Sequence, residues 1–205
     1  MTFYKIIRAI LAGFFRVLYR VHVTGEDNIP DSGAVIISPN HASAADPILL
    51  AVVARRPIRF MGKAELFRIP LLGWILKALG AFPVHRNEGD VAAIKKSLAI
   101  LSDGEMLCVF TQGTRCPGVP VRETADKVKS GVGLLTMRSG ADVVPVYIKT
   151  KANRPRMFRR TDVIFGEVIK SDEFSELIGR TKYSDAAMMI FDRICALGEQ
   201  GEDSE

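Results

Sequence analysis

Short apolar runs alternate with helix-like segments along most of this chain, and no other sequence feature constrains its fold as strongly. The apolar runs are bounded by turn residues or charges, as strands are, and lie at 34–37, 58–62, 81–84, 106–110, 143–148 and 162–169. Helical patterns lie between them, at 47–54, 87–101, 131–138 and 184–197. Because such alternation is typical of α/β proteins, we expect one domain over 23–200, with a partly parallel mixed sheet flanked by helices.

Residues 1–22 are predicted to form an amphipathic helix that precedes this domain. Its only charges are Lys5, Arg8, Arg16 and Arg20, which fall within an arc of roughly 120° on a helix. A purely basic polar face suits an interfacial position on anionic lipid. The segment is not a secretory signal because arginines interrupt its apolar region, and it lacks the ~20 uninterrupted apolar residues of a spanning helix. The alternative is a helix that packs its apolar face on the core.

A second apolar segment, 66–79, contains the only tryptophan of the chain, Trp74, between Arg68 and Lys77. This pattern is typical of a helix at a lipid–water boundary, and it is equally compatible with a buried helix. The net charge of +5 and the pI near 9.2 favour an anionic partner. A nucleic-acid partner is disfavoured, since the charge accompanies long apolar faces rather than aromatics interleaved with basic residues. The three cysteines show no recognisable pairing, which favours a reducing compartment.

A histidine and an aspartate stand five positions apart in the loop that follows the apolar run 34–37. On one helix this step would turn the two side chains about 140° apart, so we expect the helix to begin at Pro47 with Asp46 as its N-cap. His41 then lies at the carboxyl end of a strand, where open α/β sheets bind ligands. Asp46 can orient the imidazole as a general base. The alternative is that Asp46 only caps a helix and His41 is a polar loop residue.

Two further apolar runs lead into arginines. The first ends on Arg86, and the second is followed by a glycine that permits a tight turn, Gly113, and then by Arg115. Two guanidiniums at adjacent strand ends would form a phosphate clamp. Taken singly, each arginine is equally typical of a surface position where the side chain only faces solvent. Pro145, inside the run 143–148, indicates an edge strand or an interrupted ladder.

In their order and separation these motifs resemble the glycerolipid acyltransferase family, which includes bacterial 1-acyl-glycerol-3-phosphate acyltransferases. The resemblance covers roughly residues 20–170 and rests on Asn-His-x-Ser-x-x-Asp-Pro at 40–47, an HX4D motif, and on Arg86, 113–115 and 144–146. It implies catalytic roles for His41 and Asp46 and phosphate binding by Arg86. It also implies acceptor binding at 112–115, by Gln112, Gly113, Thr114 and Arg115.

The reaction that the resemblance implies is acyl transfer from a thioester, acyl-CoA or acyl-carrier protein, to the free hydroxyl of 1-acyl-glycerol-3-phosphate. The product would be phosphatidic acid, formed at the cytoplasmic face of the membrane. His41 would take the hydroxyl proton, and no nucleophilic residue is needed because a thioester is already activated. Ser43 lacks a nucleophile-elbow context. We expect no cofactor and no metal, since the three histidines are dispersed.

The chain departs from the family at Gln112, where the third motif usually has a glutamate. Compared with glutamate, glutamine lacks the charge and has two hydrogen-bond donors. This departure has three alternative interpretations: a different acceptor, a tolerated substitution, or a lipid-binding protein that lacks turnover. Lys129 is expected to add to the phosphate site. Six cations at 149–160, with no acid between them, fit a docking surface for anionic lipid, CoA phosphates or an acidic carrier protein, and fit a solvated loop about as well.

Overall fold

The computed structural model describes residues 13–84 and 91–199 and contains a seven-stranded sheet with the order β1-β7-β6-β2-β5-β3-β4. The strands are β1 (Val21–Thr24), β2 (Val35–Pro39), β3 (Ile58–Lys63), β4 (Ala81–Val84), β5 (Met106–Cys108), β6 (Asp142–Thr150) and β7 (Thr161–Phe165). All neighbouring strands are parallel except β6 and β7. The predicted mixed, largely parallel sheet is therefore confirmed.

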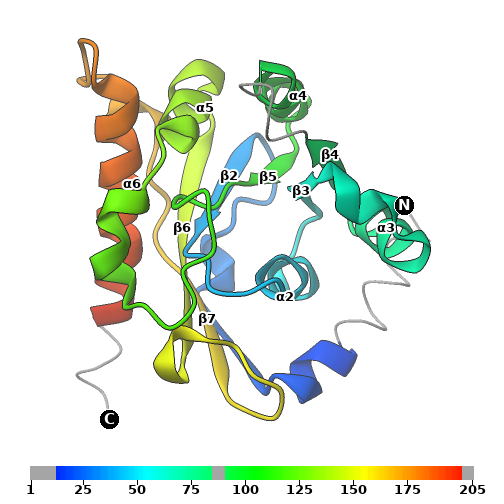
Figure 1. The fold of residues 1–205 in the computed structure, drawn as a ribbon. Coiled ribbons are helices and arrows are strands. Elements are labelled where there is room, and N and C mark those ends of the chain that lie inside the picture. Colours follow the sequence, from blue (N-terminus) through cyan, green and yellow to red (C-terminus); the bar gives the residue numbers. More distant parts are fainter. Residues whose placement is uncertain (1–12, 85–90, 200–205) are drawn as a thin grey trace.

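Helices cover both faces of the sheet (Figure 1). After the helical residues 13–18, the α-helices of the described chain are α2 (Asp46–Val53), α3 (Pro70–Ala78), α4 (Val91–Ser102), α5 (Gly131–Ser139) and α6 (Lys182–Glu199). Short 3-10 turns lie in the connections: η1 (Glu26–Asn28), η2 (Ala64–Arg68), η3 (Val121–Lys127), η4 (Lys151–Asn153) and η5 (Ser171–Phe174). The predicted start of α4 at Asn87 lies outside the described residues.

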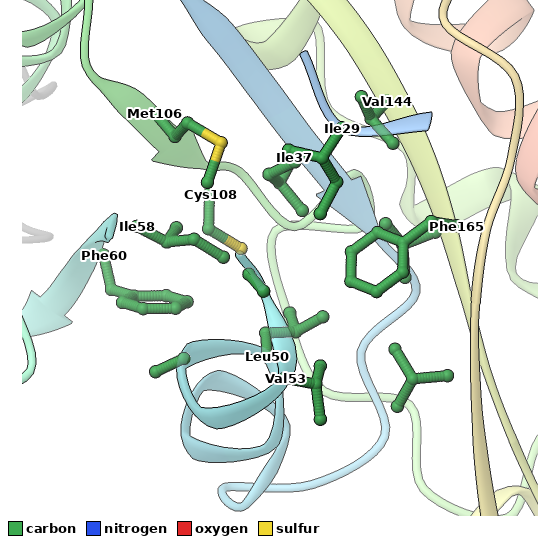
Figure 2. Close-up of a cluster of buried hydrophobic side chains, with 14 of the residues drawn as sticks. Ile29, Ile37, Leu50, Val53, Ile58, Phe60, Met106, Cys108, Val144 and Phe165 are labelled. Carbon is green, nitrogen blue, oxygen red and sulfur yellow. The ribbon is translucent and has the colours of Figure 1, made fainter. Parts of the chain in front are cut away.

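Alternate side chains of the central strands enter two separate cores, as the two-residue period of a strand requires. Ile37 and Cys108 point toward α2, and Figure 2 shows them in one cluster with Leu50 and Val53 of that helix. Ile36 points to the other face, where α4, α5 and α6 pack. Burial on both faces explains why the strand sequences are continuous apolar runs.

The beginning of the described chain differs from the predicted helix at 1–22. Residues 13–18 are helical, a turn follows, and β1 starts at Val21, inside the predicted segment. This strand pairs only with β7, at the edge of the sheet. His22 is exposed and Val23 is half-buried, as the alternation of a strand requires. The sequence did not reveal this strand, because the same residues also fit a helical pattern.

Pro145 lies in the interior of the sheet, so the edge-strand interpretation was wrong and the interrupted ladder was right. The pairing of β6 with β7 ends at Val146, opposite Phe165, and one isolated bridge between Val143 and Ile169 follows. These two pairings are offset by one residue, so Pro145 sits at a bulge. A proline is tolerated there because no ladder hydrogen bond needs its missing N–H.

The segment 66–79 forms η2 and α3, and it is not a buried helix. Trp74 is 51% exposed and Leu71 is 71% exposed, whereas Gly73 is the buried residue of α3. Gly73 packs against the backbone of Phe67, where a Cβ atom would lie 2.3 Å from a carbonyl oxygen. Leu71 and Trp74 of this helix therefore face outward, whereas Ile75 packs against the core on the α2 side of the sheet. Among the described residues, no helix is long and apolar enough to cross a membrane.

The parallel strands end together at one edge of the sheet, which we call the carboxyl edge. The chain leaves β2 toward α2 on one face and leaves β5 toward α5 on the other face. Because β2 and β5 are neighbours and the chain leaves them toward opposite faces, this is the point at which open α/β sheets place their ligands, and we call the position between the two loops the crevice. The loop that contains His41 and the loop that contains Gln112 both border this crevice.

Candidate active site

His41 and Asp46 are in direct contact at the carboxyl edge. The Nδ1 atom of His41 lies 2.9 Å from the Oδ2 atom of Asp46, whose side chain is fully buried, while the imidazole is 13% exposed. A carboxylate on Nδ1 leaves Nε2 as the ring nitrogen that can accept a proton. The pair has the arrangement of a general base and the group that orients it.

Asp46 occupies a different position in its helix from the predicted N-cap. It is the first residue of α2 and Ala45 is the N-cap, so the carboxylate does not cap the helix with its side chain. Instead, Oδ2 accepts the backbone N–H groups of Ala42 and Ser43, each at 2.8 Å. These two bonds fold the loop back over the carboxylate and bring His41 to it. Asp46 thus shapes the loop as well as orienting the ring.

His41 is also fixed through its backbone and through the face of its ring. Its N–H donates to Oε1 of Gln112 at 2.9 Å, and its carbonyl accepts the N–H of Cys116 at 2.8 Å. Its ring stacks on Phe110, with 3.8 Å between centroids and 24° between planes. Three contacts from the loop after β5 therefore hold the histidine that follows β2.

Gln112 is buried and uses both ends of its amide within the protein. While Oε1 accepts from His41, Nε2 donates to the hydroxyl of Thr124 at 3.0 Å, and that hydroxyl donates to the carbonyl of Val121 at 2.6 Å. A carboxylate at this position would have no hydrogen to give to Thr124. The glutamine therefore fits a chain of hydrogen bonds that runs from η3 to the backbone of His41.

Asn40 is a further positioning residue that the motif contained but the sequence did not explain. Its side chain forms two hydrogen bonds with the backbone of Ile148 on β6, accepting at 2.7 Å and donating at 3.2 Å. The side chain thus continues the ladder of β2 after the strand has ended. Ser38 and Thr111 add a hydroxyl pair at 2.6 Å between β2 and the loop after β5. These contacts join residues distant in the chain, and the sequence offers no local signal for them.

The remaining predicted binding residues border the same crevice from the loop after β5. Gly113, Thr114 and Arg115 are exposed there. Gly113 has φ of 65°, and a Cβ on it would lie 2.8 Å from Cγ of Lys129, so glycine is required and Lys129 lies beside it. Arg86 lies outside the described residues.

Nothing in the described part of the chain resembles a metal centre, because no group of three or more His, Cys, Asp or Glu residues gathers there. Cys108, behind the site, is buried. Burial raises the pKa of the Cys108 thiol well above its usual range, and the Asp46 charge raises it further. This thiol is therefore protonated at neutral pH and is a poor nucleophile.

The sequence profile of the acyltransferase family matches residues 20–149, which include both loops of the site. This chain belongs to that family. A 1-acyl-sn-glycerol-3-phosphate acyltransferase of Bacillus subtilis is 27% identical over 178 residues, 85% of this chain and 86% of that protein. Its namesake in Borreliella burgdorferi is 29% identical over 136 residues, 65% of this chain and 53% of that protein. The chain thus spans about half the length of the second relative.

A solved structure of the family shares the fold. The crystal structure of the LPA acyltransferase PlsC from Thermotoga maritima aligns with a TM-score of 0.71 at 20% identity, covering 98% of this chain and 82% of that one. At this identity the likeness concerns the architecture of the acyltransferase family and not its substrates.

Proposed function

We propose that this acyltransferase moves a fatty acyl group from a thioester, acyl-CoA or acyl-carrier protein, to the free hydroxyl of 1-acyl-glycerol-3-phosphate, giving phosphatidic acid. The contact between His41 Nδ1 and buried Asp46 Oδ2 carries the proposal. It provides a base at the carboxyl edge whose second ring nitrogen can meet a hydroxyl. The relatives named for this reaction support the choice of acceptor.

The mechanism is direct transfer in two steps. Nε2 of His41 takes the hydroxyl proton while the oxygen attacks the thioester carbonyl, and Asp46 stabilises the imidazolium. The tetrahedral intermediate then expels the thiolate, which takes the proton back from His41. The new ester bond replaces the C–S bond, and every residue returns to its starting state. No cofactor enters either step.

The acceptor site belongs to the same proposal. Gly113, Thr114, Arg115 and Lys129 border the crevice, and Arg86 follows β4, another strand that ends at the carboxyl edge. Cations near the crevice suit a phosphate monoester. Gln112 acts through the backbone of His41 in this scheme, so replacement of the usual glutamate is compatible with turnover.

The proposal also includes a membrane-contacting segment and a location for the enzyme. Residues 1–20 would contact the membrane interface, and the catalytic domain would begin with β1 at Val21, two residues before the predicted boundary, and extend to residue 200. We place the enzyme as a peripheral protein at the cytoplasmic face of the cell membrane, where an acyl acceptor with one fatty chain resides. The exposed Phe14 and Val17 at the end of the first segment support this assignment.

A product screen tests the proposed function. Purified protein is incubated with a panel of lysolipids and glycerol phosphate, with acyl-CoA and acyl-carrier protein as donors, and products are identified by mass spectrometry. We expect the wild type to form phosphatidic acid. His41→Ala should form it at a rate at least about 10²-fold lower. His22→Ala is the matched control, because His22 is exposed on β1. Lipid binding without any product would identify a binding protein instead.

A further inference from the structure

We infer that the connection between β6 and β7, residues 151–160, is a docking element that binds the headgroup phosphates of an anionic phospholipid membrane. The inference extends the proposed function, because it says which surface meets the lipid that carries the acceptor. The sequence of this hairpin, Lys-Ala-Asn-Arg-Pro-Arg-Met-Phe-Arg-Arg, contains five cations and no acid.

The cations of the hairpin surround a hollow rather than pointing apart. The hollow has a volume of about 170 Å³, and it is lined by Lys151, Arg154, Arg156, Arg159 and Arg160 together with Thr150 and Ala152. A neighbouring hollow of about 550 Å³ adds Arg20 and Lys149 to the same basic surface. Guanidinium groups around a hollow of this size match the oxygens of a phosphate.

Most cations of residues 151–160 have no counter-ion within the described part of the chain. Arg160 pairs with Asp162 at 2.8 Å, whereas Lys151, Arg154, Arg156 and Arg159 form no ion pair with any residue in the described ranges. Like charges gathered around one hollow repel one another. An anion bound from outside would remove this repulsion, so the cluster is complementary to an anionic partner.

Apolar side chains stand at the tip of the same hairpin. Met157 is 59% exposed and Phe158 is 70% exposed. Phe158 has φ of 62°, a conformation that is rare for a bulky residue, and its N–H donates to the carbonyl of Leu18 at 2.6 Å. The hydrogen bond attaches the tip to the helical residues 13–18, where Phe14 and Val17 are 60% and 73% exposed.

The strand directions place this surface beside the active site. β6 ends at the carboxyl edge, and β7 and β1 begin there because β7 is antiparallel to β6 and parallel to β1. The hairpin and residues 13–18 consequently lie at one end of the molecule (Figure 1). Asn153 in the hairpin also accepts the N–H of Gly118, in the loop that carries Gln112, at 3.1 Å.

Lipid fits this surface better than an acidic carrier protein does. Aromatic and aliphatic side chains flanked by arginines suit the lipid–water boundary, where the apolar groups enter the interface and the cations meet phosphates. A second exposed apolar group, Ile69 and Leu71, lies where the chain enters α3 after β3 has ended at the same edge. Exposed apolar side chains on two sides of the crevice are expected for a face that rests on a membrane.

Vesicle binding tests the inference without requiring turnover. Binding is measured by co-sedimentation with vesicles of phosphatidylcholine and phosphatidylglycerol, and with vesicles of phosphatidylcholine alone. We expect Arg156→Glu/Arg159→Glu to weaken binding to the anionic vesicles at least about tenfold, and Met157→Ser/Phe158→Ser to weaken it severalfold. Binding to neutral vesicles should change only for the second variant.

The matched control is Ile178→Ser/Arg180→Glu. Both side chains are exposed, and they lie between β7 and α6, at the opposite edge of the sheet. The control should bind anionic vesicles as the wild type does, and all variants should keep the wild-type circular dichroism spectrum and turnover of a short-chain, vesicle-free acceptor. Charge-reversed protein that binds anionic vesicles with unchanged affinity would overturn the inference.

Two further results separate this inference from neighbouring ones. His41→Ala should bind vesicles as the wild type does, because docking does not require turnover. If the wild type docks through the hairpin but forms no product, the inference stands and the proposed function fails. A hairpin variant that loses turnover only with acyl-carrier protein, while vesicle binding stays unchanged, would assign the surface to the carrier protein and overturn the lipid assignment.

Discussion

Asp46 shows how one buried side chain can both shape a loop and orient the proposed base. Its Oδ2 atom accepts from two backbone N–H groups and lies against Nδ1 of His41, whereas Oδ1 has no hydrogen-bond partner among the described residues. A buried carboxylate with an unpartnered oxygen is costly in free energy. We interpret this cost as the consequence of keeping a negative charge next to the imidazole.

Asp46→Asn should separate these two roles. The amide oxygen can still accept the N–H groups of Ala42 and Ser43, but the negative charge beside the imidazolium is lost. We expect kcat to fall about 10²–10⁴-fold, while the melting temperature changes by no more than about 4 °C. Steady-state kinetics and calorimetry measure the two effects. Asp103→Asn, at an exposed position before β5, should change neither quantity.

Gln112 is expected to act on kcat more than on acceptor affinity. Gln112→Ala leaves the N–H of His41 without its partner and breaks the connection to Thr124. We expect kcat to fall roughly 10–100-fold because the base is misplaced, with little change in acceptor KM. Gln112→Glu keeps an acceptor for His41, so it should retain more activity than Gln112→Ala. An increase in KM at unchanged kcat would instead indicate a direct acceptor contact.

At the scale of elements, the packing of α5 on α6 depends on a glycine. A Cβ on Gly133 would lie 2.1 Å from the carbonyl oxygen of Tyr183 and 3.0 Å from Cβ of Ala186. The two helices can approach only because this side chain is absent. Since both helices cover one face of the sheet, this close approach supports the core behind β6.

Gly133→Ala should therefore destabilise the protein by about 1–3 kcal/mol, because the helices must move apart or repack. Gly131→Ala is the matched control in the same helix, since a Cβ there meets nothing within 4 Å. The control should be neutral or stabilising by up to about 1 kcal/mol. Urea unfolding measures both values, and equal stabilities for the two variants would contradict the packing argument.

The sequence predicted the elements whose patterns are local and missed those fixed by distant pairing. Six apolar runs became strands, and the loop that contains His41 was correctly placed after one of them. The edge strand β1 was missed because its four residues also fit a helical pattern, and its partner β7 lies far along the chain. The support that Asn40 receives from Ile148 and that Gln112 receives from Thr124 likewise requires the folded sheet. Motif spacing therefore identified the candidate base and its partner Asp46, but not the contacts from other elements that hold the loop in place.

At the scale of the whole molecule, the basic hairpin, the helical residues 13–18 and the active site share one edge of the sheet. Arg20, Lys151 and Arg156 are among the cations that line the two hollows on this side. An electrostatic contribution to lipid binding is screened by salt.

Turnover should accordingly depend on ionic strength only when the acceptor is in a membrane. With acceptor embedded in anionic vesicles, raising the salt concentration from about 0.01 M to about 1 M shortens the Debye length roughly tenfold and should lower the rate strongly. With a short-chain acceptor free in solution, the rate should change little. Parallel assays over one salt series measure both, and equal salt sensitivity would show that membrane docking does not limit turnover.

The antiparallel pairing of β6 with β7 has a consequence for how the enzyme would meet its acceptor. If β7 were parallel to β6, a crossover would carry the chain back across the sheet, and both β7 and β1 would enter from the far side. The basic hairpin would not exist, and residues 13–18 would stand a full strand length from His41. The reversal of β7, and of β1 with it, would thus let the carboxyl edge rest on the bilayer in the docking that we propose, so that a lysolipid could react while its fatty chain stays in the membrane.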